Sequence, residues 1–293
     1  MALFQRGLFP PETESKYLLP FLSKIEALDE FLLQIPTSDK VRFFSELTVQ
    51  QWLEERDFDK VIGSLLYEIY NRLKFLLLTA VFKTQKLIEG LVLMYNSRNY
   101  LGWTLVGRSV LEHSAVLHYF STRLETLNMR RTTYKMSEVR QIEDLLIQYS
   151  HGTRFNWNAL LAGDTTILQK NYQPGEDNKR AVNVLTALSH LSREGSLYKD
   201  AESVYAMFSD FAHPNMASHS AFINLVADSS EPCGCELALD VGSDRGTVIL
   251  IFTLMPIALN LGNMEGSIRK ISGITGYWLH TVLTEGVGIT FDR

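Results

Sequence analysis

The chain has 293 residues, of which 46% are hydrophobic and 21% charged, and its formal net charge is -5 at pH 7. These fractions are ordinary for a soluble globular protein and exclude a disordered chain. The acidic balance excludes a broad nucleic-acid-binding face, because such a face needs clustered Lys and Arg to displace counterions from phosphates.

The first residues, MALFQRGLFPPETES, do not resemble a targeting segment. They lack the charged start and long apolar run of a secretory signal, and they lack the Arg- and Ser-rich pattern of a transit peptide. We therefore expect a cytoplasmic protein.

Apolar residues recur at helical spacing through most of the chain, which predicts an all-α protein. A first helix is expected after the Pro-Pro pair at 10–11 and runs to about Ile35, with Pro20 bending or splitting it. A second helix is expected to follow Ser38 as its N-cap and to continue through Trp52.

The centre of the chain is predicted to contain two long helices, at about 60–97 and 100–127. An amphipathic helix is expected at 137–150, followed by an exposed loop at 151–178, which is rich in Gly, Asn, Asp and Thr. Further helices are predicted at about 178–193, 196–212 and 217–227.

The C-terminal part contains the one predicted β-hairpin, between Ser229 and Gly246, where ELALDV lies between the turn-forming CG and GSDRG. A helix at about 247–271 and a last helix through Leu283 are expected to close the fold.

The longest apolar run, VILIFTLMPIALNL at 248–261, contains Pro256 and Asn260. It is shorter than the roughly 18 to 20 residues that cross a bilayer. We predict a kinked, buried core helix here and no membrane association, with a membrane segment as the alternative.

Together these elements predict a bundle of long helices with additional N- and C-terminal helices and one small hairpin. We expect residues 1–59 to form N-terminal helices and 60–227 to form the central bundle with a polar pocket. Residues 228–293 should pack the hairpin and C-terminal helices on the same core. A homo-oligomer or a protein partner is expected.

The only cysteines, Cys233 and Cys235 in EPCGCE, predict a turn and no metal site. A disulfide across one residue would be strained, and two thiols without neighbouring His or Cys make a poor zinc site.

The sequence also contains no Gly-rich phosphate loop, no G-x-S-x-G elbow, no H-E-x-x-H and no pair of E-x-x-H motifs. We expect no cofactor.

One candidate site lies in GRSVLEHSAVLHYF, residues 107–120, whose apolar side chains cover nearly the whole helix circumference. Arg108 and Glu112 are four residues apart and share a face. We expect them to be buried and paired, because two unpaired buried ions would each cost several kcal/mol. His113 and His118 point elsewhere, and a hydrogen-bonded core histidine is the simplest interpretation of each.

A second polar group occurs in the helical segment YAMFSDFAHPN, where Ser209 and His213 share a face with the tyrosine that begins the segment. If Arg108, Glu112, Ser209 and His213 converge, they form a polar pocket that contains donors and an anion. The alternative is a polar network that only fixes how the helices pack.

The R-x-x-x-E of Arg108 and Glu112, followed by S-x-x-x-H-P at Ser209, His213 and Pro214, resembles an uncharacterised, mostly bacterial family of all-helical proteins known only as a domain of unknown function. The similarity extends over roughly Lys60 to Leu225. The resemblance implies a helical fold and no particular activity.

Arg108 and His113 also spell R-x-x-x-x-H, which resembles the motif of the HEPN helical-bundle ribonucleases of bacterial toxin and anti-phage systems. In such an enzyme the histidine would act as general acid or base on a ribose 2'-hydroxyl, and the arginine would stabilise the phosphate in the transition state without a metal. Ser109 departs from the polar amide or acid usual after the arginine. A nuclease site should also be exposed at a dimer groove, whereas this helix is predicted to be buried.

The leading hypothesis is a binding or interaction protein whose pocket, formed by Arg108, Glu112, Ser209 and His213, holds a small anionic ligand or a partner's side chain. The first alternative is a metal-independent ribonuclease that uses Arg108 and His113. The second alternative is a structural assembly subunit, in which the cluster is internal packing. Whether the protein is an enzyme is left open by the sequence.

Overall fold

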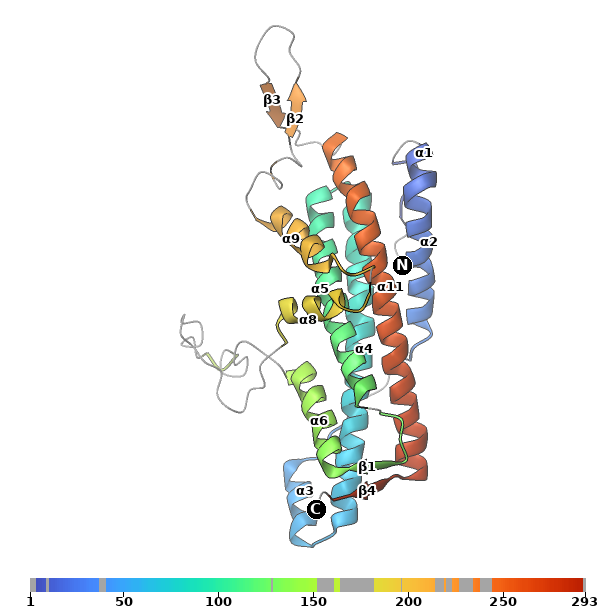
Figure 1. Ribbon diagram of the computed structural model, residues 1–293, viewed down its shortest axis with the longest axis vertical. Helices are drawn as coiled ribbons and strands as arrows, with labels where there is room; N and C mark the ends of the chain where they lie inside the picture. Colours follow the sequence, from blue (N-terminus) through green and yellow to red (C-terminus); the bar gives the residue numbers. More distant parts are fainter. Residues whose placement is uncertain are drawn as a thin grey trace. The chain divides into compact units, whose positions relative to one another are not determined.

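The computed structural model describes most of the chain and confirms the all-α fold (Figure 1). The residues described are 4–8, 11–36, 41–127, 129–151, 161–163, 182–195, 197–213, 219, 223–226, 234–237 and 244–291.

The chain forms two compact units, and each is made of three segments that are separated in sequence. Three of the boundaries between the units, at 80/81, 118/119 and 266/267, lie inside long helices, and the division expected at residues 59 and 227 stays a prediction. Unit 1 contains Met1–Pro36, Val81–His118 and Val184–Gly266, and unit 2 contains Thr37–Ala80, Tyr119–Asn183 and Ser267–Arg293.

The N-terminal helical segment of unit 1 begins after the Pro-Pro pair, as predicted. It consists of α1 (Pro11–Thr13), the π-helical turn η1 (Glu14–Leu18) and α2 (Leu19–Leu33). Pro20 lies in the first turn of α2, directly after the π-helical turn, and the chain is helical on both sides of it. The proline therefore does not end the segment.

The second predicted helix begins later than expected. Helix α3 (Glu46–Glu54) is capped by Ser45, whose side chain accepts a hydrogen bond from the Thr48 backbone N–H at 3.2 Å. Ser38, the predicted cap, lies outside the described residues. A serine followed by an acidic first turn is the usual N-terminal signal, and the sequence offers it at both positions.

The two long central helices are confirmed as α4 (Phe58–Asn96) and α5 (Tyr100–Thr126) (Figure 1). Their bounds differ from those predicted by at most two residues at either end, because their apolar periodicity is sustained over many turns.

Helices α8 (Val184–Ser192) and α9 (Ala201–Ala212) of unit 1 are shorter than predicted. The helix expected at 217–227 is wrong for strand β2 (Ile223–Val226), although His219 in the same stretch is helical. Strand β2 pairs antiparallel with β3 (Gly234–Leu237). A hairpin is therefore present, but its first strand precedes the predicted range of 229–246, and its second strand includes only the first two residues of ELALDV. Cys235 lies in β3 opposite Leu225, not in a turn, and Cys233 lies outside the described residues.

The C-terminal helix is longer than predicted. Helix α11 (Asp244–Tyr277) continues into the π-helical turn η3 (Trp278–Glu285), and Pro256 lies inside it without ending it. The span Thr247–Glu285 is long and apolar enough to cross a membrane, and 39% of its most apolar window is buried. Length and composition do not separate a membrane span from the core helix of a soluble protein.

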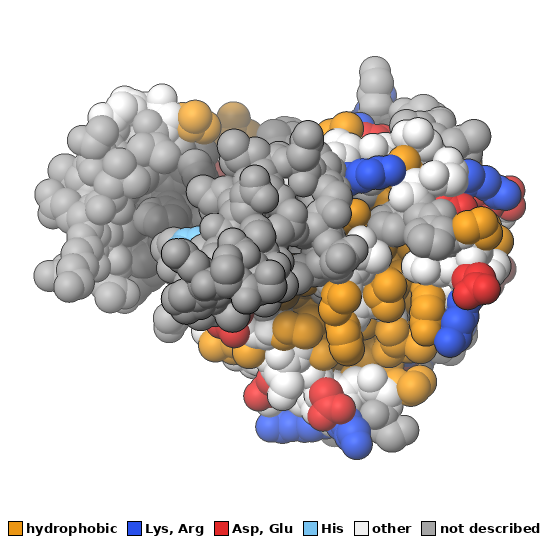
Figure 2. Space-filling model, turned by 90° about the horizontal axis from the view of Figure 1, so that it is seen from above, with side chains coloured by type: hydrophobic (Ala, Val, Ile, Leu, Met, Phe, Trp, Pro, Cys, Tyr) orange, Lys and Arg blue, Asp and Glu red, His pale blue; other side chains and the backbone are white. Residues whose placement is uncertain are grey.

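Part of α11 presents apolar side chains to the surface. Val248, Phe252 and Met255 are 49%, 71% and 67% exposed, and their spacing places them on one face of the helix. Figure 2 shows hydrophobic side chains reaching the surface next to charged ones. The prediction that the whole apolar run at 248–261 is buried is therefore wrong for this face.

The core of unit 1 joins α2, α4, α5, α9 and α11. Phe21, Tyr95 and Trp103 stack edge to face or tilted, with ring centroids 5.8 to 6.3 Å apart. The buried Trp103 indole N–H donates to the Thr253 hydroxyl at 2.8 Å, which anchors α5 to α11. Other fully buried side chains of this core are Leu18, Ile25, Leu28, Leu32, Leu91, Val110, Leu188, Phe208 and Leu250.

Unit 2 contains helix α6 (Met136–His151), as predicted, and a short parallel pair of strands that was not predicted, β1 (Thr133–Lys135) and β4 (Gly288–Thr290). The Tyr134 hydroxyl and the Trp278 indole both donate to the Met129 carbonyl, at 2.9 and 3.0 Å. These two buried rings therefore hold β1 against the end of the C-terminal helix.

Candidate functional site

The site in unit 1 begins with a glycine that brings two helices close together. A Cβ on Gly107 of α5 would lie 2.8 Å from the Phe208 ring of α9 and 2.9 Å from the Ile257 side chain of α11. Real Cβ atoms do not approach so closely, so any larger residue here would have to push these two side chains away. The close approach places α9 beside the next residue of α5, which is Arg108.

The Arg108 guanidinium is held by two partners from two helices. Its Nε donates to Glu112 Oε1 at 3.0 Å, and its Nη2 donates to the Tyr205 hydroxyl of α9 at 2.8 Å. The guanidinium carbon also lies 5.0 Å from the centre of the Tyr205 ring, within cation–π distance. The predicted pair of Arg108 and Glu112 is therefore present, and Tyr205 completes it.

The predicted burial of this pair is wrong. The side chains of Arg108 and Glu112 are 28% and 32% exposed, so both ends of the ion pair touch solvent. One face of α5 is therefore only partly covered by α9 and the rest of unit 1. The apolar sequence around Arg108 had predicted burial on every side.

The electrostatics of the cluster keep Arg108 charged. Desolvation acts to lower the pKa of Arg108, but the hydrogen bonds and charges of Tyr205 and Glu112 outweigh it and raise the pKa above its usual value. Lys83 of α4 is also near Glu112. Desolvation lowers the pKa of Lys83, although much of its side chain is exposed, and the Glu112 carboxylate opposes that shift.

Ser209 and His213 do not join the cluster in the way predicted. The Ser209 hydroxyl donates to the Tyr205 carbonyl of its own helix at 2.8 Å. His213 is the C-cap of α9 and is exposed. Among the described residues, neither side chain hydrogen-bonds to Arg108 or Glu112. The structure thus brings Tyr205 to Arg108, while Ser209 lies one turn further along α9 and His213 at its end.

His113 is buried inside unit 1, with 3% of its surface exposed. It lies five residues after Arg108 on α5 and points into the core, whereas Arg108 touches solvent. An RNA phosphate cannot reach both side chains in this arrangement, which disfavours the ribonuclease hypothesis.

A cavity of about 470 Å³ lies in unit 2, between the end of α5 and helix α6, and contains none of the predicted site residues. One side holds a cation over an aromatic ring, with the Arg123 guanidinium 5.3 Å from the centre of the Tyr119 ring. The cavity is lined by Tyr119, Arg123, Thr126, Leu127, Gln141, Asp144, Leu145 and Gln148.

Comparison with models of protein families, with curated proteins and with solved structures gave no match for this chain. The two resemblances described above therefore remain predictions, and the site must be interpreted from its own geometry.

Proposed function

We propose that this is a helical binding protein whose Arg108 cluster holds an anionic group, carried by a small ligand or by a partner protein. The observation that supports the proposal is that the Arg108 guanidinium is oriented by two hydrogen bonds and a tyrosine ring while 28% of the side chain stays exposed.

An oriented arginine favours binding because its planar fork is already in place when the anion arrives. A free arginine loses side-chain freedom on binding, whereas one held by Glu112 and Tyr205 has lost much of it in the folded state. Nη1 forms no hydrogen bond with the described residues and remains available to an oxygen of the ligand.

The charges around the site also favour an anion. Among the described residues, the two cations Arg108 and Lys83 both interact with one carboxylate, that of Glu112. Glu112 accepts the hydrogen bond from Arg108 Nε and so orients the guanidinium without using its two Nη groups. The cluster therefore suits a carboxylate or a phosphate better than a cation.

The test is a calorimetric titration of the full chain with two probes, inorganic phosphate and succinate. We expect Arg108→Gln to weaken binding by roughly tenfold, because one charge-assisted hydrogen bond contributes about 1.5 kcal/mol. Arg193→Gln is the matched control, since Arg193 is exposed in the same unit.

Unchanged affinity of the Arg108→Gln protein would contradict the proposal. An equal loss in both variants would also contradict it, because that result reports only the general charge of the surface. Circular dichroism of each variant verifies that the helices are retained.

A further inference from the structure

A second polar cluster in unit 1 contains two histidines and a glutamate. His118 lies on α5, His190 on the last turn of α8, and Glu194 just after α8. Each side chain offers one ligand atom, and these atoms all lie within 4.8 Å of one another. Unit 1 thus gathers two imidazoles and a carboxylate at one point, from segments far apart in sequence.

The ligand atoms of this cluster lie slightly further apart than they would around a small metal ion. The His118 Nε2 atom is 3.7 Å from Glu194 Oε1, and the rings of His118 and His190 have centres 5.9 Å apart. A tetrahedral ion with ligand bonds of about 2.0 to 2.2 Å places its ligand atoms about 3.4 Å apart. Small side-chain rotations would bring the three atoms onto such an ion.

The local backbone conformation after α8 places Glu194 near the two histidines. Glu194 follows His190 by four residues and lies two residues beyond the end of α8, where its backbone N–H donates to the Leu191 carbonyl at 3.1 Å and continues the helical winding. Gly195 follows with a φ of 142°, a conformation that side chains other than hydrogen rarely adopt. The chain therefore turns away directly after the carboxylate.

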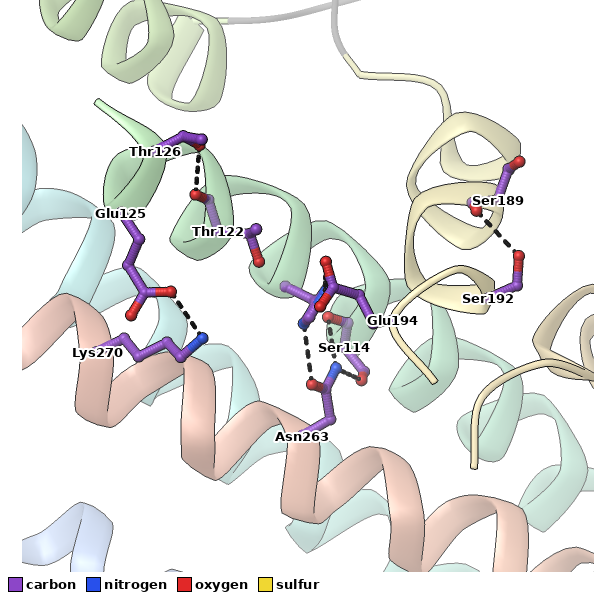
Figure 3. Close-up of polar contacts among 10 residues, drawn as sticks. Ser114, Thr122, Glu125, Thr126, Ser189, Ser192, Glu194, Asn263 and Lys270 are labelled. Carbon is purple, nitrogen blue, oxygen red and sulfur yellow. Dashed lines mark hydrogen bonds and ion pairs between the residues drawn. The ribbon is translucent and has the colours of Figure 1, made fainter. Parts of the chain in front are cut away.

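Asn263 of α11 fixes which nitrogen of His118 faces the cluster. Its amide NH₂ donates to the Ser114 hydroxyl at 2.8 Å and to the Ser114 carbonyl at 3.4 Å, which orients its oxygen toward His118 Nδ1 at 3.2 Å (Figure 3). Because that oxygen can only accept, Nδ1 carries the proton. In the neutral ring the lone pair of Nε2 is therefore directed at Glu194.

An amide oxygen behind a histidine is the arrangement found around protein metal sites. Such outer partners hold the ring in the ligating tautomer and make its free nitrogen more basic.

We propose that His118, His190 and Glu194 bind a divalent transition-metal ion of the zinc type, with Asn263 as the outer partner of His118. Two imidazoles with one carboxylate suit zinc, cobalt or iron(II) and are poor ligands for magnesium or calcium. Three protein ligands leave a fourth position for water or a ligand, as in catalytic zinc sites.

The competing explanation is an ion pair in which a protonated His118 faces Glu194. That pair needs neither His190 nor an added cation. The presence of a second imidazole within ligand distance of both groups favours the metal. The proposal is independent of anion binding at Arg108, because it uses other side chains and a different ligand.

The test is a calorimetric titration of the untagged full chain, freed of metal by a chelator, with Zn²⁺, Co²⁺ and Mg²⁺. We expect one Zn²⁺ or Co²⁺ per chain and no Mg²⁺. Visible absorption of the Co²⁺ form reports whether the ion is tetrahedral. His118 is buried and its replacement could unfold the chain, so the informative variants are His190→Ala and Glu194→Gln.

Each of these two variants should weaken Zn²⁺ binding by more than about 100-fold, and Asn263→Ala by about 10- to 100-fold, as is usual for an outer partner. The matched controls are His280→Ala and Glu202→Gln, which remove an exposed histidine and an exposed glutamate elsewhere and should leave the affinity unchanged. Absence of Zn²⁺ binding, or binding that survives both His190→Ala and Glu194→Gln, would overturn the proposal.

Discussion

Arg108 shows how an ion pair can be oriented without being buried. A fully buried pair would be costly to break, because the remaining partner would be stranded without water. Here both side chains keep about a third or less of their surface exposed, so water can solvate whichever partner remains. The energetic role of the pair is therefore modest, while its geometric role is to orient the guanidinium.

The first prediction concerns the stability of an Arg108→Ala variant. We expect a loss of about 1 kcal/mol in the free energy of unfolding, since a partly exposed pair contributes less than about 1 kcal/mol and the contact with the Tyr205 ring adds a similar amount at most. Urea unfolding followed by circular dichroism measures it, with Arg193→Ala as the control. A loss above about 3 kcal/mol would mean that Glu112 is stranded in a dry environment.

The second prediction concerns Lys83. Desolvation lowers the pKa of Lys83 and the Glu112 carboxylate acts against that shift, so Glu112→Gln should lower the pKa of Lys83 further. Protonated Lys83 then lowers the free energy of unfolding more than it does in the parent protein. This destabilisation is fully present below the lowered pKa of Lys83 and is lost as the pH rises through that pKa toward the pKa of an unfolded lysine.

NMR titration of the lysine side chain measures that pKa directly. Lys60 of the same helix has its pKa raised by its hydrogen bond to Asp57, and that raised pKa should stay unchanged in the Glu112→Gln protein. A rise in the pKa of Lys83, or no change, would show that the two groups do not interact.

The pair of Arg108 and Glu112 could be predicted from the sequence, whereas the contact of Arg108 with Tyr205 could not. Arg108 and Glu112 are four residues apart on one helix, a relation that needs no knowledge of the fold. The bond from Arg108 to Tyr205 depends on where α9 packs. The sequence placed Tyr205 on a face with Ser209 and His213, but nothing local shows which of the three reaches α5.

Helices α4, α5 and α6 were predictable because each repeats its apolar positions over many turns, which only a helix accommodates. Strand β2 was mistaken for a helix because four residues, INLV, are too few to separate the two periodicities. The pairing of β1 with β4 joins two segments of unit 2 that are far apart in sequence, and no local pattern encodes such a contact.

The third prediction tests the packing of α9 on α5. Gly107→Ala would place a Cβ against Phe208 and Ile257, at 2.8 and 2.9 Å, and must push these side chains apart. We expect a loss of about 1 to 3 kcal/mol, the usual cost of overpacking, together with weaker phosphate binding because Tyr205 moves away from Arg108.

Gly266→Ala on α11 is the matched control, since a Cβ there meets no atom within 4 Å. That variant should be more stable by up to about 1 kcal/mol, because alanine favours a helix over glycine. Equal effects of the two substitutions on the free energy of unfolding would contradict the close approach at Gly107.

The hypotheses of anion binding, metal binding and RNA cleavage place different demands on the protein. The Arg108 cluster needs an exposed guanidinium, which unit 1 provides. The His118 cluster needs ligands that converge from two segments, which it also provides. A ribonuclease of the R-x-x-x-x-H type needs an exposed histidine beside the arginine, and His113 is buried. The first two hypotheses are compatible with one another, and the third requires a rearrangement of α5.

The last prediction therefore concerns RNA. We expect cells that overexpress the chain, or its His113→Ala and His213→Ala variants, to keep intact RNA, because His113 is 3% exposed and the net charge of -5 opposes binding to a phosphate backbone. Growth and the integrity of ribosomal RNA are followed after induction. His213→Ala removes an exposed histidine in the same unit and controls for the loss of a histidine as such. RNA degradation that disappears with His113→Ala and persists with His213→Ala would establish the nuclease. It would also mean that α5 opens to expose His113, since no RNA phosphate reaches that side chain in the packed helix.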